Sequence, residues 1–383
     1  MQYDFDTIID RRLPDAVKWA VGNDELPMWI ADMDFFAAPE IKEELCRRLT
    51  HGVFGYGDVP DVWYDAYTAW WETRHGFAMQ RQGLIFCTGV VPAISGAVRK
   101  LTTPAEKVVI LTPVYNIFYN SILNNGRVVL PCPLTYENGA YDIDFSALET
   151  ALADPQTSML IFCNPHNPVG KIWDKETLAK VGKLAKDNGV TVLSDEIHCD
   201  ITAPGKDYVP FLSASNDCKE VGIACIAPTK TFNLAGLQTA AVYCENPVLR
   251  HKIRRALNTD EVAEPNCFAV PAAVAAFTKG GPWLDALREY LWENRAFAEN
   301  HIQTKIPGAK PVKAEATYLL WLDCTALSFD GDLAAHIRKT SGLLVSGGEQ
   351  YGAPKGFLRV NLACPRALLE DGLERLKKSL TSL

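Results

Sequence analysis

The middle of the chain alternates short, apolar, β-branched runs with stretches of helical period, and this alternation constrains the fold more than any other feature. Strands separated by helices pair in parallel and bury both faces of their sheet. The candidate strands are the runs 107–111, 127–130, 159–163, 190–194, 221–227 and 239–244. Between two of them, Asp174 to Asp187 has the pattern of a capped amphipathic helix, which Asn188-Gly189 ends. The alternation predicts an α/β fold with a largely parallel sheet.

The pattern changes after Asn246-Pro247, where long helices replace the alternation. Beyond Gly280-Gly281, the runs 318–323, 343–346 and 357–361 are typical of strands, with a helix over 331–340 and a last helix from residue 366. We therefore predict a large domain over residues 41–280 and a smaller α+β domain over residues 281–383. Residues 1–40 are rich in turns and aromatic side chains, so we expect this segment to pack with the small domain or to line the cleft.

Composition excludes several classes of function. A chain of 383 residues, 48% of them apolar and 22% charged, is long enough for two or three domains and has the balance of a globular protein. No segment has the apolar length of a membrane span, and the first residues lack the pattern of a secretory signal, so a cytoplasmic location is expected. The net charge of −8 and the lack of a basic cluster argue against nucleic acid and anionic membrane surfaces as partners.

Eleven cysteines lie singly along the chain, for example at Cys46, Cys87 and Cys132, with no C-x-x-C pair among them. Zinc sites and redox sites commonly show such paired spacing. We therefore predict buried thiols in a reducing compartment, and no metal site.

Lys230 follows an apolar run and lies in the segment 227–233, which has the composition of a loop. Active sites of parallel sheets lie at the carboxyl ends of the strands. A lysine that its neighbours desolvate there favours the neutral amine, which can form a Schiff base with an aldehyde cofactor. An exposed loop lysine is the alternative that this segment alone leaves open.

Asp195 follows the apolar run that ends at Ser194 and reaches the same edge of the predicted sheet. A pyridine ring that serves as an electron sink needs a protonated nitrogen, and a buried carboxylate at a strand end can pair with that nitrogen. A helix cap is the alternative for Asp195. His198, three residues further on, is compatible with a core histidine or with a position beside the same ring.

Two further strand ends carry groups that can bind a cofactor. The run 159–163 leads into the loop 164–170, where two Asn-Pro steps and a glycine make a rigid turn that can aim the Asn167 amide at a phenolic oxygen. Gly89 precedes Val90, Val91 and a proline suited to a first helical turn, so free amides there can bind a phosphate. Turn formation alone also explains much of both segments.

The run Gly356 to Cys364 is typical of a strand and carries one arginine, Arg359. The guanidinium fork matches a carboxylate in bidentate fashion, which is how an amino-acid substrate would be oriented. An ion pair at the surface is the alternative for this arginine.

Taken in order, these segments resemble the fold-type I pyridoxal-phosphate (PLP) superfamily, which has the aspartate aminotransferase fold. Within it, six segments are similar to the MalY/PatB-type cystathionine β-lyases, also called cystalysin-like C–S lyases. These segments are 27–35, 54–56, 112–115, 164–170, 194–198 and 229–237. The resemblance extends from near the start of the chain to about Arg366. It implies a mostly parallel seven-stranded sheet flanked by helices, and a homodimer with active sites at the subunit interface.

The resemblance also implies how the cofactor is held. Lys230 would be the Schiff-base lysine, Asp195 would pair with the pyridine nitrogen and Asn167 with the ring hydroxyl. Tyr115 would stack on the ring, and His198 would lie beside it. The phosphate would be bound by the amides or side chains of Gly89, Val90, Val91, Thr229 and the partner subunit's Tyr56.

The same resemblance implies the substrate contacts and the reaction. Arg359 would bind the substrate carboxylate, with Asn167, Ala31 and the partner subunit's Tyr56 around it. Lys230 would remove the α-hydrogen. The sulfur on the β-carbon would then leave, protonated by Lys230 or by a tyrosine, of which Tyr115 is the nearer candidate. Tyr56 would be a further catalytic residue. The substrate would be L-cystathionine, L-cysteine or a related cysteine S-conjugate, and the products pyruvate, ammonia and a thiol.

Three positions depart from typical class I aminotransferases. Those enzymes have a tyrosine three residues after the aspartate and an arginine eight residues after the lysine, where this chain has His198 and Gln238. A serine often found three residues before the lysine is replaced by Ala227. The first two changes favour the lyase branch. A class I/II aminotransferase stays the alternative, since transamination shares every step up to the carbanion, and a regulator that retains the PLP fold is a third.

Overall fold

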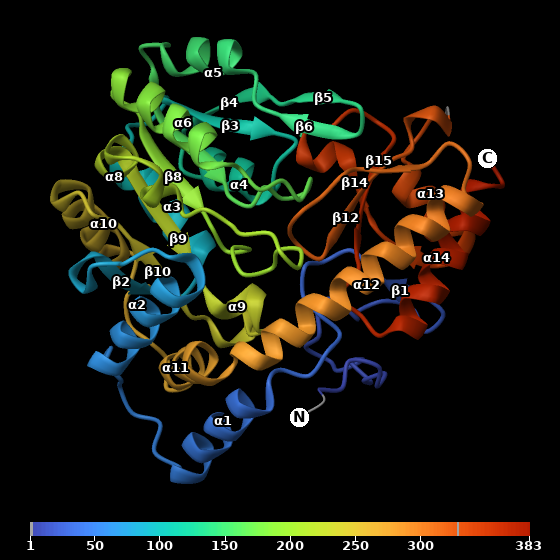
Figure 1. Cartoon of the computed structure of the whole chain (residues 1–383), viewed down its shortest axis with the longest axis horizontal. Coiled ribbons are helices and arrows are strands. Elements are labelled where there is room, and N and C mark those ends of the chain that lie inside the picture. The colour runs from blue at the N-terminus through green and yellow to red at the C-terminus, as the bar shows by residue number, and fades with distance from the viewer. Residues whose placement is uncertain (1–2, 328) are drawn as a thin grey trace.

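The computed structural model describes residues 3–327 and 329–383, and a seven-stranded sheet lies at its centre (Figure 1). In spatial order its strands are β2 (Leu84–Cys87), β10 (Ala240–Tyr243), β9 (Gly222–Ile226), β8 (Thr191–Asp195), β7 (Thr157–Cys163), β3 (Lys107–Thr112) and β4 (Val128–Pro133). Strand β10 runs antiparallel to both neighbours, and the remaining neighbours in the sheet are parallel. The predicted α/β fold with a mostly parallel seven-stranded sheet is therefore confirmed.

Helices cover both faces of this sheet, which explains why its strands are almost wholly apolar. On one face, Val108 and Leu193 belong to a core that also holds side chains of α3, α4 and α10. On the other face, Val109 and Val192 belong to a core shared with α2, α5, α6 and α11. These helices are α3 (Val90–Leu101), α4 (Ile117–Leu123), α10 (Pro247–Thr259), α2 (Asp61–His75), α5 (Phe145–Leu152), α6 (Lys175–Asp187) and α11 (Ala269–Lys279).

Two strands of the large sheet differ most from the sequence prediction. The run 127–130 was expected to end before Pro131, but β4 continues to Pro133. β4 lies at the edge of the sheet and pairs only with β3, so its prolines need not donate to a second neighbour. Strand β2 was not among the predicted strands. It has only four residues, too few for a periodic signal, and its pairing with β10 is antiparallel.

The predicted helix between β7 and β8 is confirmed as α6, and both of its end signals act as expected. The Asp174 carboxylate accepts a hydrogen bond from the backbone N–H of Thr177 at 2.7 Å. At the other end Gly189 has φ +68°, the left-handed conformation that ends a helix.

The C-terminal third forms a second, four-stranded antiparallel sheet with helices packed on it. In spatial order its strands are β11 (Lys310–Pro311), β12 (Leu319–Asp323), β15 (Phe357–Asn361) and β14 (Ser346–Gly347). The long helix α12 (Gly281–Lys305) leads into this part, followed by α13 (Leu333–Ser341) and α14 (Arg366–Leu380) (Figure 1). The predicted run 357–361 is confirmed without a shift.

The predicted strand 343–346 was wrong as a single element. Its first half, β13 (Leu343–Leu344), pairs in parallel with β1 (Leu26–Pro27), whereas Ser346 belongs to β14 and pairs with β15. Leu26 and Met28 are buried in the same core as α13 and α14. The N-terminal segment therefore packs on the C-terminal part of the chain.

The remaining elements are short or peripheral. They are α1 (Pro39–His51), β5 (Thr135–Glu137), β6 (Ala140–Asp142), α7 (Phe211–Ala214), α8 (Asn216–Val221), α9 (Pro228–Thr231) and the 3₁₀ turns Arg81–Gly83, Ala235–Leu237, Thr325–Leu327 and Gly348–Tyr351. Within residues 3–327 and 329–383, none of the helices combines the length and apolar character needed to cross a membrane.

Candidate active site

The carboxyl ends of β7, β8 and β9 meet at a cavity of about 200 Å³. This is the edge at which parallel sheets bind their ligands. The cavity is lined by Ala31, Thr88, Gly89, Val90, Val91, Pro92, Tyr115, Asn167, Asp195, Ile197, His198, Thr229, Lys230, Ala235 and Gln238. Most of the residues predicted from the sequence are therefore brought together at one place.

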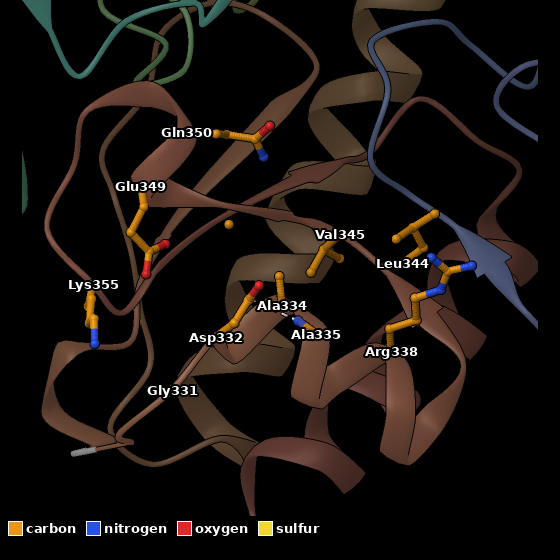
Figure 2. Close-up of a pocket in the computed structure, with 11 residues that line it drawn as sticks. Gly331, Asp332, Ala334, Ala335, Arg338, Leu344, Val345, Glu349, Gln350 and Lys355 are labelled. Carbon is orange, nitrogen blue, oxygen red and sulfur yellow. Dashed lines mark hydrogen bonds between the residues drawn. The ribbon is translucent and has the colours of Figure 1, made fainter.

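A larger hollow of about 650 Å³ lies between α13 and the segment that follows β14 (Figure 2). Its charged side chains, Asp332, Arg338, Glu349 and Lys355, are exposed, and Arg338 already pairs with Glu25. Groups open to solvent in this way keep their ordinary chemistry. The smaller, more enclosed cavity is therefore the candidate active site.

Lys230 is the third residue of the one-turn helix α9, which begins with Pro228 directly after β9. Its Nζ donates a hydrogen bond to the carbonyl oxygen of Ala31, in the N-terminal segment. Burial lowers the pKa of Lys230 to about 8, against a smaller opposing effect of Asp32. The neutral, nucleophilic amine is accordingly more accessible here than on an ordinary surface lysine.

Asp195 is the last residue of β8 and is buried, with 4% of its surface exposed. Burial raises the pKa of its carboxyl to about 7, and Lys230 opposes that effect only weakly. One carboxylate oxygen accepts the backbone N–H of Ile197 at 3.1 Å. Among the described residues the carboxyl has no cation in salt-bridge contact, so it is suited to a positively charged ligand atom.

His198 is buried beside these groups, and burial lowers the pKa of its imidazole to about 3, with Lys230 and Arg359 acting in the same direction. The ring is therefore neutral at physiological pH. Its Nδ1 is buried without a hydrogen-bond partner in the described part of the chain, and the ring packs edge-on near Tyr318 at 5.8 Å between centroids.

Arg359, on β15, does not itself line the cavity, but it contacts Asn167, which does. Its Nη1 donates to Asn167 Oδ1 at 3.2 Å and its Nη2 to the carbonyl of Trp29 at 2.9 Å. The guanidinium lies over the ring of Tyr351, 4.7 Å from the centroid. The side chain is buried, its Nε has no partner, and no carboxylate of the described residues pairs with it. Two of the five guanidinium N–H donors are thus engaged, and the Nε–H and one N–H on each Nη are left for a carboxylate ligand.

The start of α3 also lines the cavity, through Gly89, Val90, Val91 and Pro92. Gly89 is the residue that caps this helix, and no side chain occupies its first N–H groups. Amides free in this way, at the positive end of a twelve-residue helix, are suited to a phosphate. Thr229 adds a hydroxyl nearby, whereas Lys230 is the one cationic side chain in the cavity lining.

The two predicted tyrosines differ in position. Tyr115 lines the cavity, and burial raises the pKa of its hydroxyl to about 12, so the proton stays on the oxygen at neutral pH. Tyr56 is fully exposed, in the irregular link between α1 and α2, and does not line the cavity of its own chain.

Sequence reasoning missed several residues of the site. Tyr318 and Tyr351 come from the second sheet and its connections, and nothing local marks either as a site residue. Gln238 was noted only as a departure from aminotransferases, yet it lines the cavity with a left-handed φ of +52°, unusual for glutamine. Other missed members of the lining are Thr88, Pro92, Ile197 and Ala235.

The chain belongs to the family described as aminotransferase class I and II, whose profile matches residues 26–376. Within that class, cystathionine β-lyase PatB of Bacillus subtilis (strain 168) is 42% identical over 385 residues, covering 98% of this chain and 100% of PatB. Protein MalY of Escherichia coli (strain K12) is 33% identical over 391 residues, covering 100% of each protein.

A solved structure extends the likeness to three dimensions. Cystalysin from Treponema denticola, which contains a pyridoxal 5'-phosphate cofactor, matches with a TM-score of 0.96 at 32% identity and with 100% of each chain covered. These findings confirm the resemblance to the PLP superfamily and to its MalY/PatB-type branch, as well as the predicted fold class.

Proposed function

We propose that this chain is a PLP-dependent C–S β-lyase, which cleaves L-cystathionine, L-cysteine or a related cysteine S-conjugate to pyruvate, ammonia and a thiol. The observation that carries the proposal is a buried carboxyl without a cation, Asp195, in one cavity with a lysine of lowered pKa, Lys230. The 42% identity to cystathionine β-lyase PatB over nearly the whole chain supports the reaction type.

The polar groups that line the cavity fit the cofactor. Asp195 would pair with the pyridinium nitrogen, the Lys230 amine would take the aldehyde, and the free amides at Gly89, Val90 and Val91 would hold the phosphate with the Thr229 hydroxyl. Asn167 and His198 would lie beside the ring, and Tyr115 against its face. When bound, the cofactor supplies a ring that accepts the electrons left on the substrate's α-carbon.

The chain's own residues would carry the remaining steps. The remaining N–H donors of Arg359, next to Asn167, would bind the α-carboxylate and so fix the orientation of the α-hydrogen. Lys230, neutral when released, would take that proton at Nζ. Either Lys230 or Tyr115, whose pKa of about 12 keeps it protonated, would then donate a proton to the leaving sulfur.

A homodimer is part of the proposal. Tyr56 and its neighbours Val53 and Phe54 are exposed on the link between α1 and α2, although all three carry large apolar surfaces. A second copy of the chain would cover these side chains, and the partner subunit's Tyr56 would then complete the phosphate and substrate sites. Mixed dimers of Y56F and K230A subunits test this arrangement, because one site in each mixed dimer would be intact.

The proposal also includes the domain organisation and the location of the protein. We place the domain division near residue 280, where α12 begins, with residues 1–40 packing on the C-terminal part through β1. A cytoplasmic location fits the eleven free thiols, which a reducing compartment preserves.

Pyruvate release decides between elimination and transamination. The purified protein is mixed with L-cystathionine in the absence of any 2-oxo acid, and pyruvate and free thiol are measured together. Equal amounts of both support the lyase. An amine form of the cofactor that accumulates without pyruvate would instead support an aminotransferase. This alternative is compatible with membership in the aminotransferase class I and II family.

Absorbance of the purified protein tests the cofactor itself and the third alternative, a regulator without catalysis. The expected visible band should disappear on treatment with borohydride and should be missing from K230A. A colourless wild-type protein would contradict the PLP assignment, whatever its activity.

A further inference from the structure

The N-terminal segment, which Lys230 contacts at Ala31, carries a cluster of four charged side chains that the proposed reaction does not use. Arg11 binds Asp32 through Nη2 at 2.8 Å and Asp34 through Nη1 at 2.6 Å. Lys18, which is 2% exposed, pairs with Asp34 at 2.7 Å. Asp34 is thus fully engaged, whereas Oδ1 of Asp32 is buried without a hydrogen bond and lies 3.6 Å from Lys18.

The backbone around Asp32 is fastened to the turn that carries Lys230. The Ala31 carbonyl accepts hydrogen bonds from both Lys230 Nζ and the Tyr318 hydroxyl. Asn233 lies three residues after Lys230 and exchanges hydrogen bonds of 3.0 Å with both the N–H and the carbonyl of Met33. Asp32 follows Ala31 directly, so its carboxylate is held in a fixed place relative to the lysine.

Of the charged groups around Lys230, Asp32 is the one that acts most strongly on the pKa of its amine. Those acting on the lysine are Asp32, Arg359, Asp195 and Lys18, with neutral His198 and Tyr318 also facing it. Among these charges, Asp32 has the largest effect on the pKa of Lys230. The pKa of Tyr318 is raised mainly by burial and, to a smaller extent, by Asp32. Under the proposed function Asp195 pairs with the cofactor ring and Arg359 with the substrate. Asp32 is then the carboxylate that remains for the lysine.

We propose that Asp32 is a positioning residue that stabilises the protonated form of Lys230 Nζ. It thereby keeps the proton on the lysine between its removal from the α-carbon and its delivery to the leaving sulfur. The inference rests on the proposed function, because it concerns the same lysine, and it adds a residue that acts without touching cofactor or substrate. Arg11, at 2.8 Å, and Lys18, at 3.6 Å, would hold the Asp32 carboxylate in place.

The test is a pH titration of the cofactor's visible absorbance in the holoenzyme, which reports protonation at the nitrogen of Lys230. In D32N the midpoint should fall by about one pH unit, since an opposite charge nearby favours the protonated form. D32E keeps the charge and should restore a midpoint near that of the wild type. D32S removes the charge with a smaller side chain and serves if D32N does not fold. In both neutral variants Lys18 and Arg11 still have Asp34 as a partner.

R11Q is the matched control, because it breaks the same cluster but removes a positive charge. Its midpoint should stay or rise. A fall of equal size in R11Q and D32N would show that the cluster acts only through structure and would overturn the proposal, as would an unchanged midpoint in D32N. A wild-type protein without a visible band would contradict the proposed function itself, so the two failures are distinguishable.

Discussion

Replacement of Arg359 by lysine tests whether the substrate carboxylate binds to the unpaired N–H donors of this guanidinium. Lysine keeps the positive charge but offers three N–H donors from a single atom, in place of a planar fork. In the native site, Arg359 already donates to Asn167 Oδ1 and to the Trp29 carbonyl, and its Nε is unused. A lysine that satisfies both of these acceptors has one donor left for the substrate, so the bidentate contact is lost.

The expected loss follows from that count of donors. One hydrogen bond to a charged group contributes about 1.5–3 kcal/mol. At about 1.4 kcal/mol per factor of ten, R359K should lower kcat/KM roughly 10- to 150-fold. Most of the loss should fall on KM, because the carboxylate is bound in the ground state as well as in the transition state.

Pyruvate release measures kcat and KM for L-cystathionine, and a competitive inhibitor measures carboxylate binding alone. A suitable inhibitor is 3-(methylthio)propanoate, which has the carboxylate and the sulfur but no amine. Its inhibition constant should rise in R359K by a factor similar to that of KM. R127K is the control, since Arg127 is also buried but donates to Thr102, outside the cavity lining. An inhibition constant that R359K leaves unchanged would refute this assignment of the carboxylate site.

Three further predictions concern the cofactor and the loop that holds Asn167. D195N removes the carboxyl that would keep the pyridine nitrogen protonated, so kcat should fall at least roughly tenfold, with partial recovery in D195E; a kcat equal to that of the wild type would contradict the pairing. The rate at which the cofactor-free chain recovers its visible band on addition of PLP should increase as pH rises through about 8, where Lys230 loses its proton, instead of near the ordinary lysine value. G170A should lower the free energy of unfolding by about 1–3 kcal/mol in denaturant titrations, because Gly170 has φ +73° and an added Cβ would lie 2.7 Å from the Ala316 carbonyl. A change below roughly 0.5 kcal/mol, the level of an ordinary surface substitution, would contradict that reasoning.

The large sheet could be predicted because its signal is local. Runs such as Met159 to Cys163 are continuous and apolar, as strands buried on both faces must be. Where pairing depends on distant partners, the prediction was incomplete. The segment 343–346 is shared between β1 and β15, and only the folded chain shows that its two halves have different neighbours.

The same distinction applies to the site. Lys230, Asp195 and Asn167 were found because each follows a strand of the parallel sheet, and the carboxyl ends of such strands meet. Tyr318 and Tyr351 were missed because they belong to the part of the chain around the second sheet and contact Ala31 and Arg359, which only folding brings to the site. Asp32 lies in a segment that the sequence singled out, but its relation to a lysine 198 positions away exists only after folding.

The polar groups of the cavity are incomplete in a way that one pair of ligands completes. In the described part of the chain, a buried carboxyl, a buried guanidinium without an acid and a buried lysine of lowered pKa each oppose folding, because burial disfavours charge. Under the proposed function, a pyridinium nitrogen, a substrate carboxylate and an aldehyde would be the respective partners of Asp195, Arg359 and Lys230. The cofactor alone would compensate Asp195 and Lys230, whereas Arg359 would be compensated only by the amino acid. Selectivity for α-amino acids would therefore follow from the burial of Arg359, since a ligand without the carboxylate would leave this guanidinium uncompensated.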